Sequence, residues 1–350
     1  MHRIILFCQR AYSFSILRPL EIAARARNVD VLWYVGPAIV QRFPYRADSA
    51  VTSSIAELEG FAADAIFVPG NDVPYYLRGV KAQIFHGFAG EKKGHFRIRG
   101  YFDLYLTQGP YFTCRFEALR ARHRNFDVAE TGWPKLDQLF DGSINTAALS
   151  AKYCITAGRS VVLYAPTFSP SLTSAQALLR QWQALAATTD WVILIKFHPL
   201  MEPAVVQEYR NAFAASANIH IVDDDDITPL LMIADVMVSD TSSVVYEFLL
   251  LDKPVVTYKS SARDIHWCDI DTPQALESMC REALAGGRLR DNPVKDAYHP
   301  YTDGQSAARM LDAVEAYIRQ HSVPDKRSLN WFRRRKIHKI YGAPGRSASR

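Results

Sequence analysis

Short apolar runs alternate with longer amphipathic stretches along most of the chain. The apolar runs are rich in Val, Ile and Leu without polar alternation, which is typical of strands buried on both faces of a parallel sheet. The stretches between them have the length and spacing of helices. The pattern therefore predicts an α/β fold of parallel strands with helical crossovers. The predicted strands are 3–8, 30–35, 65–68, 81–85, 104–107, 128–130, 160–164, 191–195, 219–222, 236–239 and 254–258.

A break in this pattern at Asp141-Gly142-Ser143 separates two series of strand–helix units. A length of 350 residues with 49% hydrophobic content is enough for two domains, each with its own core. We therefore expect a first domain over residues 1–145 and a second over residues 146–325, closed by a long helix over 306–320. Residues 326–350 are expected to form a separate tail.

The basic residues are concentrated in this tail. Residues 326–350 hold nine of the 41 Lys and Arg and none of the 36 Asp and Glu, so residues 1–325 are mildly acidic. Basic and aromatic side chains interleave before Gly342, which predicts either a short amphipathic helix or a disordered, solvated end. Anionic membranes and nucleic acids are the two partners that such a charge would attract.

The five cysteines are scattered without close pairing, which argues against a disulfide framework and for a reducing compartment. The chain enters the first predicted strand directly, without the apolar region and cleavage site of a secretory signal. No apolar run approaches the length of a membrane span. We therefore expect a cytoplasmic protein.

Polar clusters follow several of the predicted strands directly. Because the carboxyl ends of parallel strands share one edge of a sheet, where ligands bind in such folds, these clusters are candidate binding groups. They are His86-Gly87, Thr131–Lys135, Tyr164–Thr167, Lys196–Pro199 and Asp240–Ser243.

The turn Asp240–Ser243 lies between the strand over 236–239 and a helix predicted over 244–251. Free backbone N–H groups and the dipole at a helix start, with added hydroxyl donors, are suited to hold an anion. The alternative is that Ser242 and Ser243 only cap the helix. One residue is enough for a cap, so four polar residues in a row favour a ligand.

Two histidines and a lysine are the other candidates for chemistry. His86 can act as a general base near neutral pH, or it can be a hydrogen-bonded structural residue. Lys196 and His198 alternate around an apolar residue, so both can face one side of the strand end, where they suit a diphosphate. The alternatives are a surface lysine and a histidine that caps the turn at Pro199.

Metal and nucleotide-loop motifs are missing from the sequence. The run Asp223–Asp226 is expected to be a solvated loop, because oxygen ligands for a metal need spacing. No Cys/His spacing indicates zinc. There is neither a G-x-x-x-x-G-K-[ST] nor a G-x-G-x-x-G motif, which argues against a P-loop protein or a dehydrogenase. We expect no metal and no cofactor.

Five motifs in order resemble the CDP-glycerol glycerophosphotransferase family, whose members build teichoic-acid-like and capsular poly(glycerol phosphate). The motifs cover residues 84–310. They are Phe85-His86-Gly87 followed by Lys92-Lys93-Gly94; Tyr164-Ala165-Pro166-Thr167; Lys196-Phe197-His198-Pro199; Ala234-Asp235 with Ser239–Ser243 and Lys253-Pro254-Val255; and Asp303-Gly304 before the last long helix.

The resemblance implies the GT-B architecture, two Rossmann-like parallel-sheet domains that face a central cleft, with CDP-glycerol or a related CDP-alditol bound by the second domain and no metal required. It implies that His86 deprotonates an acceptor hydroxyl and that His198 binds or stabilises the diphosphate. Asp303 and Gly304 would close the nucleotide site. The other implied substrate contacts are Lys196, Thr167, Asp240, Thr241, Ser242, Ser243 and Glu247.

Two positions depart from the family pattern. The usual His-Gly-Thr-Pro is here His86-Gly87-Phe88-Ala89, which bears on the acceptor side. Glu247 stands where Asp is common, and a carboxylate there could still meet ribose hydroxyls.

The resemblance predicts transfer of glycerol phosphate from CDP-glycerol to a hydroxyl of a lipid-linked or polymeric acceptor. A GT-B glycosyltransferase or UDP-sugar 2-epimerase that acts on a UDP-sugar is the alternative, since the same scaffold hosts both. A third possibility is a non-catalytic protein with a decayed site. With a lipid-linked acceptor, we expect the tail 326–350 to bind an anionic membrane rather than nucleic acid, on the inner face of a bacterial cell membrane.

Overall fold

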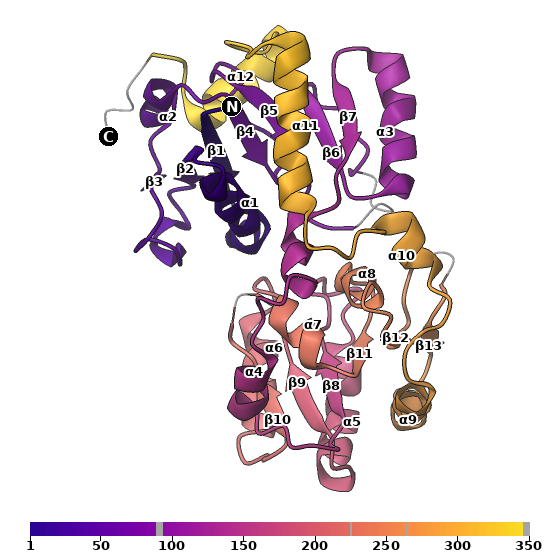
Figure 1. Ribbon diagram of the computed structural model, residues 1–350. Coiled ribbons are helices and arrows are strands. Elements are labelled where there is room, and N and C mark those ends of the chain that lie inside the picture. The colour runs from indigo at the N-terminus through magenta and orange to yellow at the C-terminus, as the bar shows by residue number, and fades with distance from the viewer. Residues whose placement is uncertain (89–93, 225, 263–264, 346–350) are drawn as a thin grey trace. The chain divides into compact units, whose positions relative to one another are not determined.

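The computed structural model describes residues 1–88, 94–224, 226–262 and 265–345. The chain forms two compact units, each with its own sheet (Figure 1). The first unit is Met1–Asp141 with Asp296–Arg350, and the second is Gly142–Lys295. Each unit is a parallel sheet with helices on both faces, so the predicted α/β fold is confirmed.

The first unit contains a seven-stranded sheet in the order β3-β2-β1-β4-β5-β6-β7, parallel throughout. In β1, Ile4 and Leu6 alternate with Ile5 and Phe7, and all four are fully buried, because both faces of the sheet are covered. The strands are β1 (Arg3–Cys8), β2 (Asp30–Val35), β3 (Val51–Thr52), β4 (Ala65–Val68), β5 (Val80–Gln83), β6 (Leu104–Thr107) and β7 (Asp127–Glu130).

Helices α1 and α11 contact each other and lie over one face of this sheet, as Figure 1 shows. Residues of α2, α3 and α12 join the apolar cluster on the other face, around Ile5 and Phe7. The helices of the unit are α1 (Phe14–Ala26), α2 (Ile55–Phe61), α3 (Pro110–His123), α11 (Ser306–His321) and α12 (Trp331–Tyr341), with 3-10 turns η1 (Ala11–Ser13), η2 (Val40–Arg42) and η3 (Pro134–Leu139).

The second unit contains a six-stranded parallel sheet in the order β10-β9-β8-β11-β12-β13. Its strands are β8 (Val161–Tyr164), β9 (Val192–Ile195), β10 (Ile219–Ile221), β11 (Val236–Ser239), β12 (Val255–Tyr258) and β13 (Cys268–Ile270). Its helices are α4 (Thr146–Lys152), α5 (Ala175–Thr188), α6 (Pro203–Ala212), α7 (Thr228–Ile233), α8 (Val244–Leu249) and α9 (Leu276–Gly286), with the 3-10 turn η4 (Pro273–Ala275); α10 (Pro293–Tyr298) joins the two units.

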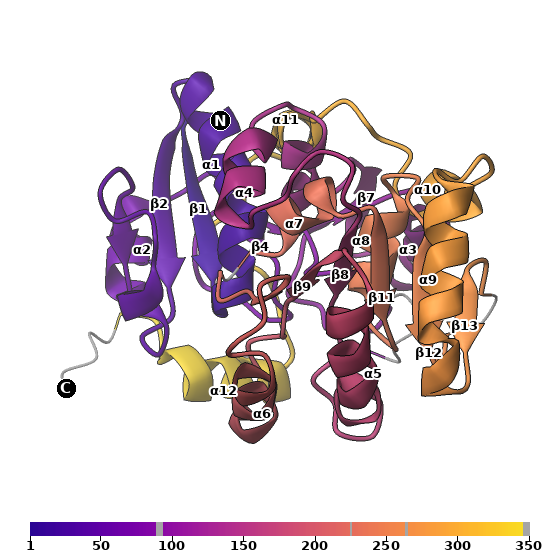
Figure 2. The ribbon, with the colours of Figure 1, turned by 90° about the horizontal axis from the view of Figure 1, so that it is seen from below.

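The core of the second unit packs α5, α6 and α9 against one face of its sheet. Trp182 of α5 and Tyr209 of α6 are fully buried beside Tyr164 of β8, and large aromatic groups of this kind supply much of the buried apolar area. Helix α9 lies along β12 on the same face, as Figure 2 shows. On the other face, α7 contacts β8 and α8 contacts β11.

Element boundaries follow the sequence pattern closely in the second unit. The strand β11 has the predicted limits, because a continuous apolar run defines it locally. Helix α7 begins with Thr228-Pro229, a residue pair that favours a helix start. In the first unit the prediction of a strand over 81–85 is wrong at its end. The strand β5 stops at Gln83, and Phe85 takes a left-handed conformation with φ of +60° that no strand residue adopts.

The structure divides the chain differently from the predicted domain limits. The long helix α11 was expected to close the second domain, but it packs on α1, β5 and β6 of the first unit. Its first turn is capped by the buried carboxylate of Asp137, which accepts hydrogen bonds from the backbone N–H groups of Ser306 (2.9 Å) and Ala307 (2.7 Å). Burial raises the pKa of Asp137.

The tail is part of the first unit as far as it is described. The tail was predicted to be either a short amphipathic helix or a disordered end, and the structure contains the helix, α12. Residues 346–350 lie outside the described residues. Leu329 and Ile337 are buried in the apolar cluster of that unit. Arg327 forms an ion pair with Asp103, and its Nε donates to the carbonyl of Gly100 at 2.6 Å. A chain shortened at residue 324 would therefore expose the core of the first unit.

Among the residues that the structure describes, no helix has both the length and the apolar character to cross a bilayer.

Candidate functional site

His86 lies in the loop that follows β5 in the first unit. The neighbouring Phe85 and Gly87 are buried, whereas His86 is exposed. The left-handed φ of Phe85 is unfavourable for a residue with a side chain, and such strain is found where the surrounding structure fixes a functional group. The fold thus turns the imidazole outward at the carboxyl end of a central strand.

The ring of His86 has a defined hydrogen-bond orientation. Its Nδ1 lies 2.9 Å from the carbonyl oxygen of Pro69, which follows β4. A carbonyl oxygen can only accept, so Nδ1 carries the hydrogen. In the neutral ring Nε2 is then the nitrogen with the lone pair, the form that a general base needs.

Two side chains from distant parts of the unit hold the His86 loop. The indole Nε1 of Trp133 lies 3.4 Å from the carbonyl of Phe85. The amide of Gln108 donates to the carbonyl of Gly87 at 3.1 Å. The loops after β6 and β7 therefore fix the backbone on both sides of the histidine, and no local sequence pattern indicates this support.

A second histidine lies behind the first. His95 stacks on Phe85, with ring centroids 5.0 Å apart and an angle of 13° between the planes. Burial lowers its pKa to about 3, with the charge of His86 as a smaller cause, so His95 is neutral at physiological pH. The preceding motif residues Lys92 and Lys93 lie outside the described residues, as does Ala89.

In the second unit, Asp240 organises the carboxyl edge of the sheet. It follows β11, is 1% exposed, and accepts hydrogen bonds on both oxygens, from the backbone N–H groups of Thr167 and Ser174 and from the Ser174 hydroxyl, each at 2.8 Å. Burial raises the pKa of Asp240 against the effect of these bonds. The carboxylate therefore holds the loop after β8 in place, and this loop carries Thr167.

The hydroxyl residues after Asp240 are half-buried at the start of α8. Thr241 accepts a hydrogen bond from the backbone N–H of Ser261 at 2.9 Å, which ties the turn to the loop after β12. Ser243 occupies the N-cap position, but its hydroxyl makes no capping bond among the described residues. Ser243 therefore lacks the capping hydrogen bond that the alternative of a simple helix cap requires.

Lys196 and His198 follow β9, beside these groups. The Nζ of Lys196 is buried and donates to the carbonyl of Phe197 at 2.9 Å. The Nδ1 of His198 accepts from the backbone N–H of Leu200 at 3.1 Å. A neutral His198 therefore carries its hydrogen on Nε2, which makes that atom a donor.

The topology brings the predicted groups of the second unit together. The strands β9, β8 and β11 are neighbours, so the residues that follow them share one edge of the sheet. The ring of His198 stacks on Phe168 of the β8 loop, with centroids 4.4 Å apart and an angle of 27° between the planes. Glu247 is 4% exposed on α8, behind this edge.

Asp303 and Gly304 belong to the first unit rather than to this group. The Asp303 carboxylate is engaged by the guanidinium of Arg309 at 2.7 and 3.2 Å, which lowers its pKa. Gly304 has a φ of +67°, and a Cβ there would come within 3.0 Å of Asp141. The glycine is therefore required by the turn that leads into α11.

The acidic run after β10 is used within the fold. Asp223 pairs with Arg210, and Asp224 pairs with Lys152 at 2.7 Å, which lowers the pKa of Asp224. Asp226 accepts from the backbone and the hydroxyl of Thr228, while Asp225 lies outside the described residues. Within the described part of the chain, no group of three or more His, Cys, Asp or Glu side chains is arranged to hold a metal ion.

Lys253 of the Lys-Pro-Val motif has a structural use that the sequence did not reveal. Its Nζ donates to three carbonyl oxygens at the end of α7, those of Leu231 (3.0 Å), Met232 (2.7 Å) and Ala234 (2.7 Å). These carbonyls have no partner within the helix, and a cation also suits the helix C-terminus. Burial lowers the pKa of Lys253 to about 8.

Two Rossmann-like parallel-sheet units of this kind define the GT-B class of proteins. The structure is similar to the wall teichoic acid polymerase TagF, with a TM-score of 0.65 over 91% of this chain and 89% of that one at 15% identity. It is also similar to the S. aureus protein MnaA in complex with UDP, with a TM-score of 0.65 over 91% and 97% of the two chains at 13% identity. At these identities the likeness concerns the fold.

The sequence identifies the family within this class. The family described as CDP-glycerol:poly(glycerophosphate) glycerophosphotransferase matches residues 92–264, a segment that begins just after His86. The teichoic acid ribitol-phosphate polymerase TarK of Staphylococcus aureus is 25% identical over 77% of this chain. A teichoic acid glycerol-phosphate primase of Bacillus spizizenii is 34% identical over 36% of it. These matches confirm the family resemblance that the motifs predicted, and the chain spans 57% and 32% of the length of these two relatives.

Proposed function

We propose that the protein transfers an alditol phosphate, with glycerol phosphate as the first candidate, from a CDP-linked donor to a hydroxyl group of a lipid-linked or polymeric acceptor. The observation that carries the proposal is the opposite hydrogen-bond state of two histidines at the carboxyl edges of the two sheets. The Nδ1 of His86 donates to Pro69, and the Nδ1 of His198 accepts from Leu200. One Nε2 is therefore suited to take a proton, and the other is suited to donate a hydrogen bond.

In the proposed reaction His86 takes the proton from the acceptor hydroxyl as its oxygen attacks the phosphorus that carries the glycerol. The bond between this phosphorus and the oxygen bridging to the other phosphate breaks, and CMP leaves. A new phosphodiester joins the acceptor to glycerol phosphate. The proton resides on His86 until water or product removes it, so the step is balanced without an oxidant or a further reactant.

In this proposal His198 donates from Nε2 to the diphosphate, and the positive charge of Lys196 and the hydroxyls of Thr241, Ser242 and Ser243 offset the charge that develops on it. Charge stabilisation of this kind is the main contribution that proteins make to phosphoryl transfer. Asp240 and Thr167 act by holding the loop after β8, on which Phe168 supports the His198 ring. The lipid-linked acceptor would place the protein on the inner face of the cell membrane.

The decisive experiment separates the donor from the acceptor. Thermal unfolding with CDP-glycerol, CDP-ribitol, CDP, UDP and UDP-N-acetylglucosamine identifies the nucleotide, because a ligand that binds the folded state raises the midpoint. Release of CMP with a panel of lipid-linked acceptors then identifies the reaction and the alditol. Stabilisation by uridine compounds alone would overturn the proposal in favour of a UDP-sugar enzyme.

A further inference from the structure

Helix α12 has two faces of different character. Ile337 is fully buried, the ring of His338 stacks against Tyr75, and the hydroxyl of Tyr341 donates to Asp72 at 2.8 Å. These contacts fix the inner face on the first unit. The opposite face contains Trp331, Phe332, Arg335, Lys339 and Ile340, all of them exposed.

The outer face carries large apolar side chains at an unusual density. Trp331 is 61% exposed, Phe332 is 77% exposed and Ile340 is 47% exposed. Of the eight large hydrophobic residues that are exposed in the described part of the chain, three lie on this one helix. The two aromatic rings contact each other edge to face, with centroids 5.1 Å apart. Such a concentration of apolar surface indicates a partner.

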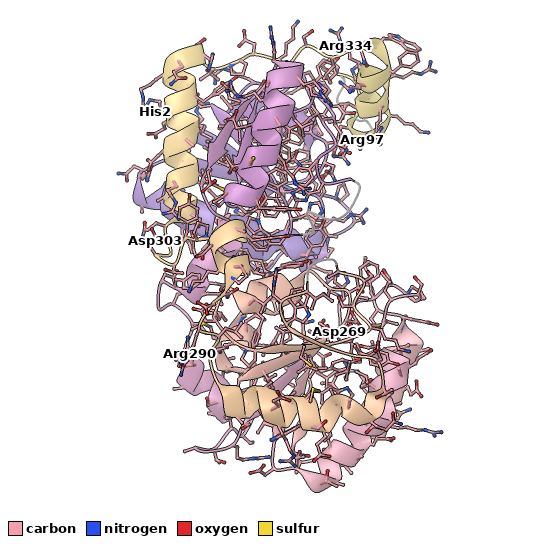
Figure 3. The ribbon with its side chains drawn as sticks, turned by 90° about the vertical axis from the view of Figure 1, so that its right-hand side faces the viewer. His2, Arg97, Asp269, Arg290, Asp303 and Arg334 are labelled. Atoms are coloured by element: carbon pink, nitrogen blue, oxygen red, sulfur yellow. The ribbon has the colours of Figure 1, made fainter. Side chains whose placement is uncertain are left out.

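The same face is basic, because Arg335 and Lys339 are exposed on it. Helix α12 as a whole contains three arginines, two lysines and no acidic residue. The guanidinium of Arg335 lies 5.3 Å from the centre of the Trp331 ring. Figure 3 shows Arg97, from the loop before β6, on the same side of the first unit as Arg334 of α12. The loop abuts the helix, since a Cβ on Gly100 would come within 2.6 Å of the Arg333 guanidinium.

We propose that the outer face of α12 lies on an anionic lipid surface. A helix that presents aromatic rings and Lys or Arg to the same side matches the boundary between headgroups and acyl chains, where the rings enter and the cations meet phosphate. A second copy of this chain fits less well, because two such faces would bring like charges together. Nucleic acid would use the cations but does not require the apolar residues Phe332 and Ile340 to be exposed.

The test uses the full chain and vesicles of phosphatidylcholine with or without phosphatidylglycerol, in a sedimentation assay. The unchanged protein should bind the anionic vesicles, and binding should weaken with salt. The variants Trp331→Ala/Phe332→Ala and Arg335→Gln/Lys339→Gln should each lower the vesicle partition coefficient about ten-fold or more, because the rings and the charges both contribute. All four residues are exposed, so thermal unfolding should be unchanged.

Two matched variants show whether the effect belongs to this face. Arg120→Gln/Arg122→Gln removes two charges from the exposed surface of α3, and Ile22→Ala removes an exposed apolar group from α1. Both should bind vesicles like the unchanged protein.

Three results would overturn the proposal. One is no binding to anionic vesicles, and another is equal loss of binding in the control variants. The third is vesicle binding that survives in the α12 variants while their binding to a single-stranded oligonucleotide is lost. The assay needs no substrate, so its outcome is separate from that of the proposed reaction.

Discussion

The two candidate histidines each follow a strand at the carboxyl edge of a parallel sheet, but the chain supports them in different ways. His198 depends on its own loop, where the backbone N–H of Leu200, two residues later, donates to its Nδ1. His86 depends on residues that are distant in sequence, with Pro69 as the partner of its ring and Gln108 and Trp133 as partners of its backbone. The ring nitrogen of a histidine that carries the hydrogen is therefore set by its backbone partner rather than by its position after a strand.

The largest effect is expected from His86→Asn, which removes Nε2 but can keep a donor toward Pro69. If His86 is the base, turnover should fall by about 10²–10⁴-fold. Binding of CDP-glycerol, measured by calorimetry, should stay within about two-fold, because the donor is assigned to the other unit. Unchanged turnover would remove His86 from the mechanism and with it the proposed difference between the histidines.

The next largest effect is expected from His198→Ala. Loss of a hydrogen bond to a charged phosphate should cost about 1.5–3 kcal/mol of donor binding, measured by calorimetry with CDP-glycerol. The variant His198→Gln keeps an N–H donor and should recover part of the loss. If alanine binds the donor as well as histidine does, Nε2 of His198 is not a donor to the diphosphate.

A smaller loss is expected from Ser242→Ala/Ser243→Ala. Each hydroxyl should contribute on the order of 1 kcal/mol to donor binding. Ser278→Ala, on the surface of α9, is the control and should bind normally. A chelator should leave turnover unchanged in all of these proteins, and a loss that a divalent ion restores would show that the reaction needs a metal.

Tyr341→Phe tests the long-range support of His86. Asp72 accepts hydrogen bonds from the Tyr341 hydroxyl (2.8 Å) and from Gln9 (2.9 Å), and Asp72 lies in the same turn as Pro69. Loss of the hydroxyl should loosen this turn and lower kcat about five-fold, the equivalent of one hydrogen bond, with donor binding unchanged. Tyr76→Phe is the matched control, since its hydroxyl donates to the backbone of Gly342 outside the turn. Equal effects in both variants would indicate general destabilisation.

The smallest effect on activity is expected from His95→Phe, although stability should respond to pH. The pKa of His95 is about 3 in the folded protein and about 6.5 when unfolded, so the unfolded state binds the extra proton. His95 therefore favours folding above pH 6.5, and this contribution is lost as the pH falls from about 6.5 to about 3. Denaturant unfolding across that range should show a weaker acid dependence in the variant. If the pH profile of turnover has a titration near neutral pH that is absent in His95→Phe, His95 rather than His86 would be the general base.

Local patterns predicted the second unit well because its candidate site is built from short segments. The run Val236–Ser239, the turn that follows it and the helix start at Thr228-Pro229 are all encoded by neighbouring residues. The stacking of Phe168 on His198 joins two strands, and only the strand order shows it.

The first unit shows the limit of such patterns. The apolar run through Phe85 reads as a strand, but the structure turns at that residue because Trp133 and the loop around it fix the backbone. The cap that Asp137 provides for α11 joins segments about 170 residues apart, so spacing and composition placed that helix in the second domain. The burial of Ile337 likewise depends on a tertiary contact that amphipathicity alone does not specify.

Lys253 has a consequence for how relatives of this protein are recognised. Its role is to close the end of α7, so selection for folding alone would keep it. The segment that marks the family, residues 92–264, contains Lys253 and Asp240 but begins after His86. A related protein that had lost the proposed base, His86, would still match the family over the whole of this segment. Active and inactive members should therefore be sorted by the residue at position 86 and the carbonyl that orients it.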